Sequence, residues 1–248
     1  MAVSDTDAFF SPVILVIAVA TVATMLIYWA ISAAFFRQDA AETMAGAASA
    51  SYYNSVNIGL PIATYVLGDP TYVIPALVLQ MAVLSPIVIA GLDRSASGVW
   101  KSVVAGLTAP VVVAAFAGFA VSAASWTVPE PVLAPLKILG GASIPLILMS
   151  FGASLTGERV LQSHRGPTIT ATALKLVGMP AVAWVLASLM HLDGTETYAA
   201  LILCALPTAQ NVYNYAATYR SGEVICRDTV FLTTFLALPA MLIIAGMF

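Results

Sequence analysis

The chain has 248 residues, of which 60% are hydrophobic and only 8% are charged. Soluble proteins carry roughly 25% charged residues, so this composition excludes an ordinary soluble domain and makes lipid the solvent. The net charge of −3 says little by itself, and we expect neither a nucleic acid partner nor a cofactor.

Apolar residues fall in blocks of about 20, the length that carries an α-helix across a hydrocarbon core of roughly 30 Å. Because that core offers no water to free backbone groups, such blocks must be helical. The sequence therefore predicts an all-α integral membrane protein. We expect eight spans, at about residues 10–35, 46–67, 72–92, 99–123, 133–155, 168–190, 196–219 and 228–247.

The start of the second span differs from the others, since it is rich in Ala, Gly and Ser rather than in Leu and Ile. Small residues let helix backbones approach closely in a membrane. We therefore expect this helix to pack against other helices and not against lipid.

The connections between spans carry charge in an alternating pattern. The stretches at 68–71, 125–131 and 191–197 and the N-terminus hold acidic residues and no Lys or Arg. The positive-inside rule makes the other side cytoplasmic, so we expect a multi-pass protein of the plasma or inner membrane with both termini outside. That other side holds Arg37, Arg94, Lys101, Arg159, Arg165, Arg220 and Arg227.

Two pairs of spans resemble each other. The second contains Gly59-Leu60-Pro61-Ile62-Ala63 and the seventh contains Ala205-Leu206-Pro207-Thr208-Ala209. The third and the eighth each place a Pro before an Ile-Ala-Gly run. Spans five apart cross in opposite directions, which is typical of an inverted-topology repeat. Because Pro breaks helices, and broken helices in a membrane line cavities, the two Leu-Pro pairs predict a transporter site.

Amide side chains gather at the two predicted breaks: Asn54, Asn57, Gln210, Asn211 and Asn214. They either bond each other and the freed backbone, as glue between helices, or line a cavity in which amide donors and half-helix N-termini hold an anion. The two roles are compatible, since donors left over can serve a ligand. For the tyrosines that flank the breaks we favour packing and interface anchoring over stacking on a substrate. These are Tyr52, Tyr53, Tyr213 and Tyr215.

Lys175 lies near the middle of the sixth span, where a Lys costs about 2.5–3.5 kcal/mol on insertion scales. We expect it to face protein or a wet cavity, and either to balance the C-terminal ends of half-helices or to attract an anionic substrate. Lys137 lies about a turn from a membrane edge and is expected to snorkel. Acidic residues are missing from the span centres, which argues against cation exchange as the main task.

The stretch Asn54-Ser-Val-Asn-Ile-Gly-Leu-Pro61 resembles the Asn–x4–Gly–x–Pro signature of the auxin efflux carrier family, which includes plant PIN carriers and bacterial permeases. Residues 136–155 are similar to the family's seventh helix, and residues 206–219, 230–234 and Leu238-Pro239 are similar to its last two. The resemblance covers about residues 10–248.

This resemblance implies an NhaA-like fold of ten helices, an inverted five-plus-five repeat whose two broken helices cross at mid-membrane. Residues 1–92 would be the remainder of the first repeat, with family helices 3–5, and residues 93–248 the second repeat, with helices 6–10. Eight of the usual ten helices would be present, as in a shortened product or one with a misassigned start. The first two helices belong to the part that family members use for scaffolding and dimer contact. For this chain, a homodimer is one option.

By the same resemblance, Asn54 matches the family's Asn before the first crossing, and Pro61 and Pro207 match the crossing prolines. Val212 stands where plant members place a second Pro, which disfavours auxin and favours small carboxylates such as malate or malonate. Lys175 lies where bacterial members often carry a Lys.

Together these features predict a secondary transporter that moves a small organic anion by alternating access. Two alternatives stay open: a sodium-coupled symporter of the bile-acid type and a non-transporting, truncated membrane scaffold. We do not expect an enzyme, since neither His164 nor His191 has a nucleophile constellation around it. The candidate substrate-binding residues are Asn54, Asn57, Pro61, Lys175, Pro207, Gln210, Asn211 and Asn214.

Overall fold

The structure is a computed structural model, and it describes residues 11–69, 72–93, 101, 104, 107–108, 110–124, 126–154, 156 and 159–248. This part of the chain is helical, and its extended backbone is confined to an isolated bridge and the connections. The first half holds α2 (Pro12–Phe35), α3 (Ala40–Ser51), η1 (Ser55–Gly59), α4 (Leu60–Tyr65), α5 (Ile74–Leu79), η3 (Gln80–Leu84) and α6 (Ser85–Leu92). The second holds α8 (Pro110–Ala123), α9 (Glu130–Ser154), α10 (Arg165–Ala173), η4 (Leu174–Gly178), α11 (Met179–Leu189), α12 (Gly194–Cys204), α13 (Gln210–Tyr219) and α14 (Glu223–Ala245).

The described parts of all eight predicted spans contain helix, which confirms an all-α membrane protein. Within the described residues, four ranges are single helices long and apolar enough to cross a membrane: Pro12–Phe35, Ile74–Leu92, Arg165–Leu189 and Glu223–Ala245. The start of the fourth predicted span and Arg94 lie outside the described residues.

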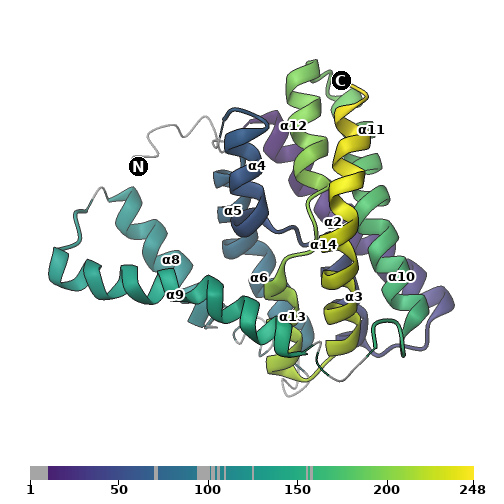
Figure 1. The fold of residues 1–248 in the computed structure, drawn as a ribbon, viewed down its shortest axis with the longest axis horizontal. Coiled ribbons are helices and arrows are strands. Elements are labelled where there is room, and N and C mark those ends of the chain that lie inside the picture. The colour runs from purple at the N-terminus through teal and green to yellow at the C-terminus, as the bar shows by residue number, and fades with distance from the viewer. Residues whose placement is uncertain are drawn as a thin grey trace.

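The helices stand side by side in one bundle, from which α8 and α9 extend (Figure 1). Helix α2 packs on α3, α11 and α12, while α3 packs on α6, α10 and α14. Helix α9 meets the bundle at α13, and α8 meets it at η3. The core of the molecule therefore lies around α3 and the ends of α12 and α13.

Helix α3 is the buried helix that its small residues predicted. Every residue from Ala45 to Ser51 is buried, and Gly46 lies so close to α2 that an added Cβ would stand 2.0 Å from the Tyr28 hydroxyl oxygen. The neighbouring α2 exposes Leu15, Leu26 and other large apolar side chains to the outside. Small residues thus bring α3 into the centre, and larger ones face the lipid.

Both predicted interruptions occur, but Pro61 does not cause the first one. Helix α3 ends at Ser51, and the chain runs without helix through 52–54 before η1 begins. Pro61 lies in the first turn of α4 and is exposed. The π-helical turn of η1 runs directly into α4, and Leu60 donates its N–H to the Ser55 carbonyl within it. The wider turn lets the helix accept a residue that lacks an N–H.

The same combination recurs in two other spans. The segment η3 ends two residues before Pro86, and η4 ends two residues before Pro180. In each case the helix continues across the proline. Proline in these spans therefore marks a π-turn, and the true breaks lie elsewhere.

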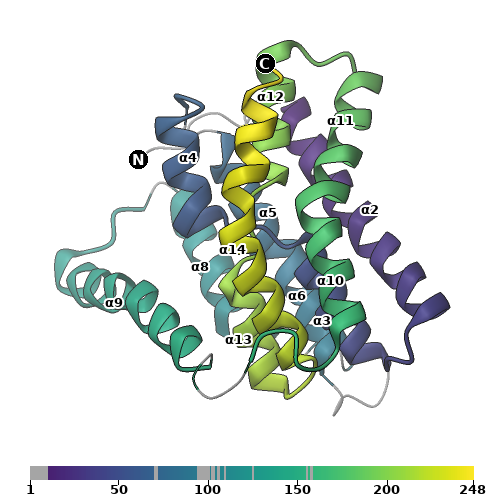
Figure 2. The same cartoon turned by 45° about the vertical axis from the view of Figure 1, so that its right-hand side comes forward.

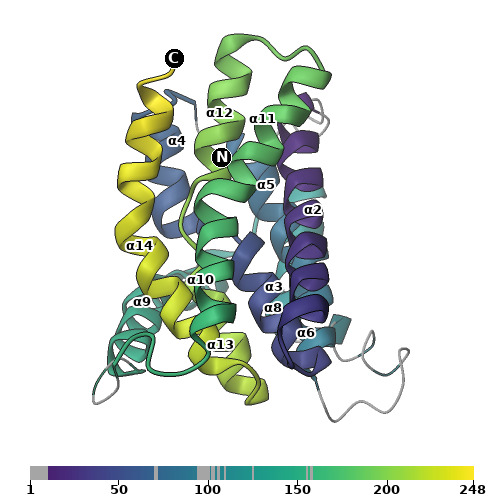
Figure 3. The same ribbon diagram turned by 90° about the vertical axis from the view of Figure 1, so that its right-hand side faces the viewer.

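Alternate connections share an end of the bundle, as the charge pattern predicted. The start of α10 and the end of α13 lie at the lower end in Figure 2. A Cβ added at Gly166 would stand 3.0 Å from the Phe36 ring, and one added at Gly222 would stand 2.3 Å from the Ala45 Cβ. The end of α4, the start of α12 and the C-terminus lie at the opposite end (Figure 3). One assignment was wrong: Arg227 is not in a connection but within α14, which already begins at Glu223.

Arg227 is buried because it has a partner in the next residue. Its Nη2 atom lies 2.9 Å from Oδ1 of Asp228, and Oδ2 of the same carboxylate accepts the Leu161 N–H at 2.8 Å. This pair joins the connection between α9 and α10 to the start of α14. The buried charge is thus both paired and hydrogen-bonded, as it must be.

Replacing Gly46 by Ala tests the close packing of α3. The new methyl group would overlap Tyr28, so we expect the free energy of unfolding to fall by about 1–3 kcal/mol, measured in detergent by chemical denaturation. The matched control is Gly152→Ala in α9, where an added Cβ meets nothing within 4 Å. That change should be neutral or stabilise the helix. Equal losses in the two variants would contradict the packing argument.

Candidate functional site

The two interruptions meet. Tyr53 and Thr208 form an isolated antiparallel bridge, in which the Asn54 N–H donates to the Pro207 carbonyl at 2.9 Å. In return the Ala209 N–H donates to the Tyr52 carbonyl at 3.1 Å. The unwound segments 52–54 and 205–209 therefore cross in contact, as the sequence predicted. Pro207 takes part through its carbonyl oxygen, which needs no N–H.

The crossing brings the N-terminal ends of two half-helices together. Asn57 lies in η1 and Gln210 is the first residue of α13, and the Asn57 Nδ2 atom donates to Gln210 Oε1 at 3.1 Å. First-turn N–H groups have no partner within their own helix and carry a partial positive charge. Two such ends, from segments about 150 residues apart, thus adjoin at one place.

A cavity of about 160 Å³ opens beside this contact. Its walls come from the two unwound segments, from the first turns of η1 and α13, and from the middle of the third predicted span. None of the lining residues carries a charged side chain. They are Tyr53, Asn54, Ser55, Val56, Asn57, Leu77, Gln80, Met81, Ala209, Gln210 and Asn211.

Two amides at the cavity, Asn54 and Gln210, use their side-chain oxygens within the protein and keep their side-chain N–H groups free. Asn54 is 5% exposed, and its Oδ1 accepts the Asn57 N–H at 3.2 Å. Gln210 is 9% exposed, and its Oε1 accepts from Asn57. Within the described residues no group accepts from Asn54 Nδ2 or Gln210 Nε2, and Asn211 makes no side-chain hydrogen bond. The role as glue between helices is therefore present, and N–H donors remain that this role does not use.

Four of the predicted site residues do not line this cavity: Pro61, Lys175, Asn214 and Pro207. Pro61 is on the exposed side of α4, and Asn214 is one turn further along α13 than the lining residues. Lys175 is fully buried on η4 and does not line the cavity. The structure thus brings together Asn54, Asn57, Gln210 and Asn211, with Pro207 in the bridge beside them.

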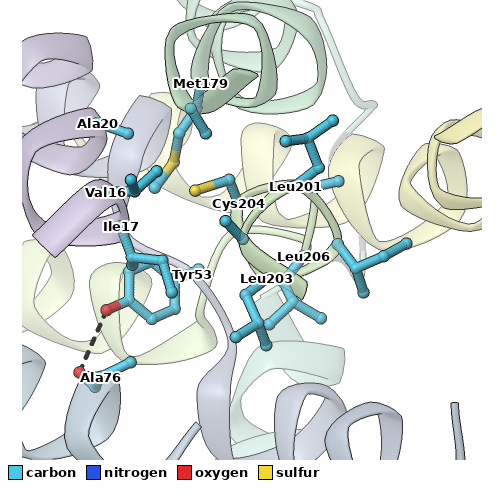
Figure 4. Packing of buried hydrophobic residues seen from close by; sticks show 14 of the residues in the cluster. Val16, Ile17, Ala20, Tyr53, Ala76, Met179, Leu201, Leu203, Cys204 and Leu206 are labelled. Atoms are coloured by element: carbon cyan, nitrogen blue, oxygen red, sulfur yellow. Dashed lines mark hydrogen bonds between the residues drawn. The ribbon is translucent and has the colours of Figure 1, made fainter. Parts of the chain in front are cut away.

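Lys175 binds the end of a half-helix. Its Nζ atom donates to the carbonyl of Cys204, the last residue of α12, at 2.6 Å and lies 3.2 Å from the Met179 sulfur. The Nζ atom also lies 6.0 Å from the ring centre of Tyr53. Figure 4 shows Tyr53, Met179 and Cys204 in the same cluster of buried residues. A helix C-terminus carries partial negative charge. Of the two roles open to Lys175, these contacts favour balancing a half-helix end.

The tyrosines at the crossing mainly pack and bond to neighbours. The Tyr52 and Ser85 hydroxyl oxygens are 2.5 Å apart, and the Tyr52 ring meets Tyr215 edge to face at 6.4 Å. The Tyr53 hydroxyl donates to the Ala76 carbonyl at 3.1 Å, and Tyr53 is among the residues that line the cavity. The expectation of packing is met at Tyr52 and Tyr215.

Sequence reasoning missed Gln80. Its carboxamide is buried at the cavity wall, where Nε2 donates to the Tyr53 carbonyl at 2.7 Å and Oε1 accepts from the Ser55 hydroxyl. A signal was present, because Gln80 is the one amide in the apolar run of residues 72–92. An isolated amide in a membrane helix needs a polar partner, and the nearest unwound backbone supplies it.

A family model described as "Membrane transport protein" matches residues 95–245, more than half of the chain. The chain belongs to this family, that of the auxin efflux carriers. It is similar to an uncharacterized transporter of Methanocaldococcus jannaschii, with 28% identity over 107 residues. That match covers 43% of this chain and 34% of the relative, so the chain spans about a third of the relative's length there. An auxin efflux carrier is a membrane transport protein and not an enzyme, in line with the sequence prediction.

Replacing Lys175 by Met tests whether it balances the end of α12. Burying the Lys175 ammonium costs more free energy than its contacts with one carbonyl and one thioether recover. We therefore expect the melting temperature to stay level or rise. Substrate flux should fall at least tenfold, because the end of α12 beside the crossing loses its balancing charge. Both are measured on one preparation, by thermal unfolding in detergent and by uptake into proteoliposomes. The control is Lys137→Met, since Lys137 is exposed beside Glu130; wild-type flux in Lys175→Met would remove the assigned role.

Proposed function

We propose that this auxin efflux carrier family member is a secondary transporter that moves a small organic anion by alternating access around the crossing. The observation that carries the proposal is the set of free N–H donors at the cavity, on Asn54, Gln210 and Asn211. These donors adjoin the N-terminal ends of two half-helices, and half-helices that end at mid-membrane are how such carriers hold their substrates.

The polarity of the cavity favours an anion over a cation. Each helix N-terminus contributes roughly +0.5 of a charge, and the oxygens of Asn54, Gln210 and Gln80 already accept hydrogen bonds from the protein. A cation would meet donors and positive dipole ends, whereas a carboxylate would meet its natural partners. This argument supports an anion carrier and disfavours the sodium-coupled alternative for this cavity.

The cavity is large enough for an organic guest. Its volume of about 160 Å³ is well above the roughly 10–15 Å³ of such space that one water needs. We propose a small carboxylate, such as malonate or malate, as the guest. The presence of Val212 in place of a second Pro, where plant members differ, supports this choice.

The arrangement of the halves supports an NhaA-like inverted repeat. In the first half an unbroken α2 precedes the broken pair α3–η1, and α5–α6 follows; in the second half α10–α11 precedes the broken pair α12–α13, and α14 follows. We assign residues 1–92 and 93–248 to the two repeats. Alternating access would move these paired halves relative to α8 and α9, and a homodimer is a further element of the proposal.

The orientation follows from the basic connections, which we assign to the cytoplasm. Ser163 and Thr195 are exposed at opposite ends of the bundle, while the native Cys204 and Cys226 are buried. In intact cells we expect a membrane-impermeant maleimide to label Thr195→Cys at once and Ser163→Cys after permeabilisation. The reverse order of labelling would invert the proposed topology.

Uptake of labelled carboxylates into proteoliposomes tests the function, with and without sodium or a pH gradient. We expect flux for at least one small carboxylate, lowered at least tenfold by Asn54→Ala, because the variant loses a donor in the cavity. Asn214→Ala should have a smaller effect, since Asn214 does not line the cavity. Both variants must insert at wild-type levels for the comparison.

Three results would overturn the proposal. Unchanged flux in Asn54→Ala would remove the substrate site from the crossing. Strict sodium dependence, with no uptake in its absence, would move the protein to the sodium-coupled class. Absence of flux for every carboxylate would favour the non-transporting scaffold.

A further inference from the structure

The bridge leaves backbone groups that the crossing itself cannot satisfy. In this bridge Asn54 and Ala209 donate across to Pro207 and Tyr52, so the N–H and C=O groups of Tyr53 and Thr208 point away from the partner segment. At membrane depth such groups need other partners. The Tyr53 carbonyl accepts the Ser55 N–H at 3.0 Å and a side-chain N–H as well, and the Thr208 N–H donates to a side chain.

Those side chains come from matching places in the two halves. Gln80 Nε2 donates to the Tyr53 carbonyl at 2.7 Å, and Thr233 Oγ1 accepts the Thr208 N–H at 3.1 Å. Each lies in the span that follows its own broken helix, at the same distance before a proline, Pro86 or Pro239. The sequence match between the third and eighth spans therefore coincides with a match in contacts.

The Leu-Pro pairs of the second and seventh spans lie at different positions relative to the bridge. Pro207 directly precedes the bridging residue Thr208, whereas Pro61 follows the bridging residue Tyr53 by two turns of helix. The pair that relates the two halves is thus Gln80 with Thr233, and it holds the bridge from both sides.

Gln80 and Thr233, the two clamps that hold the bridge, differ in their other contacts. Thr233 donates its hydroxyl to the Thr229 carbonyl of its own helix at 2.7 Å and does not line the cavity. Gln80 lines the cavity, and its Oε1 accepts from the hydroxyl of Ser55, the first residue of η1. Both ends of one buried carboxamide are therefore bound to the segment that carries Asn54.

We propose that Gln80 is a positioning residue that determines substrate specificity, whereas its counterpart Thr233 supports the bridge alone. By holding Tyr53 on one side and Ser55 on the other, Gln80 sets the place of the Asn54 carboxamide between them. Its loss lets the donors of the first half shift relative to those on α13. This inference rests on the proposed function, because substrate specificity is measured as transport of different carboxylates.

Gln80→Met and Thr233→Val form the matched test, because each keeps side-chain volume and removes the hydrogen bonds. For the carboxylate that wild type transports best, we expect Gln80→Met to raise KM at least tenfold with the maximal rate within threefold. The order of preference among carboxylates should change as well. Thr233→Val should leave KM within twofold and that order intact. Equal KM shifts in both variants, or an unchanged KM in Gln80→Met, would overturn the proposal.

A second readout is independent of transport. Val56 follows Ser55 and is partly exposed at the cavity, so Val56→Cys reports on the position of η1 through its rate of reaction with a maleimide. Gln80→Met should raise that rate at least fivefold, and Thr233→Val should not. Equal reaction rates in the two variants would contradict the role of Gln80 in positioning η1. If wild type moves no carboxylate while the rates still differ, the proposed function fails and the clamp remains. Gln80→Asn, too short to reach both partners, replaces Gln80→Met if the latter does not insert.

Discussion

The backbone bridge between Tyr53 and Thr208 is the interaction on which the rest of this structure depends. A helix that stops inside a membrane exposes N–H and C=O groups with no water to bind them. Here two interrupted helices solve the problem together, by donating across the crossing through Asn54 and Ala209. The cavity, the adjoining helix N-termini and the spare amide donors all follow from that contact.

Charge is sorted to the two sides of the crossing. On the cavity side lie the N-terminal ends of η1 and α13 with the amides around them. On the other side Lys175 binds the C-terminal carbonyl of α12, close to the Tyr53 ring. A cation placed behind the bridge balances the negative helix end and leaves the neutral cavity to the guest. In the function proposed above, Lys175 acts on the anion site through the end of α12 without lining the cavity.

Three of the prolines follow π-helical turns. Pro61, Pro86 and Pro180 each follow a π-helical segment, and the helix continues across each of them. The extra residue in the turn moves the backbone carbonyl that proline would otherwise meet. Two of these turns also carry buried polar side chains, since η3 begins with Gln80 and η4 contains Lys175. A widened turn thus re-aims a polar side chain toward the crossing.

The sequence by itself determined the class of the protein, the approximate ranges of its helices, the burial of α3 and the family. These properties follow from composition, period and local motifs, which act over a few turns of chain. It also placed Asn54, Asn57, Gln210 and Asn211 near a crossing. Only the tertiary structure decided that the first break lies at Tyr52–Asn54, that Lys175 binds Cys204, and that Gln80 belongs to the site. Each of those facts is a contact between distant segments, and side-chain chemistry alone does not say which free backbone group a buried donor will reach.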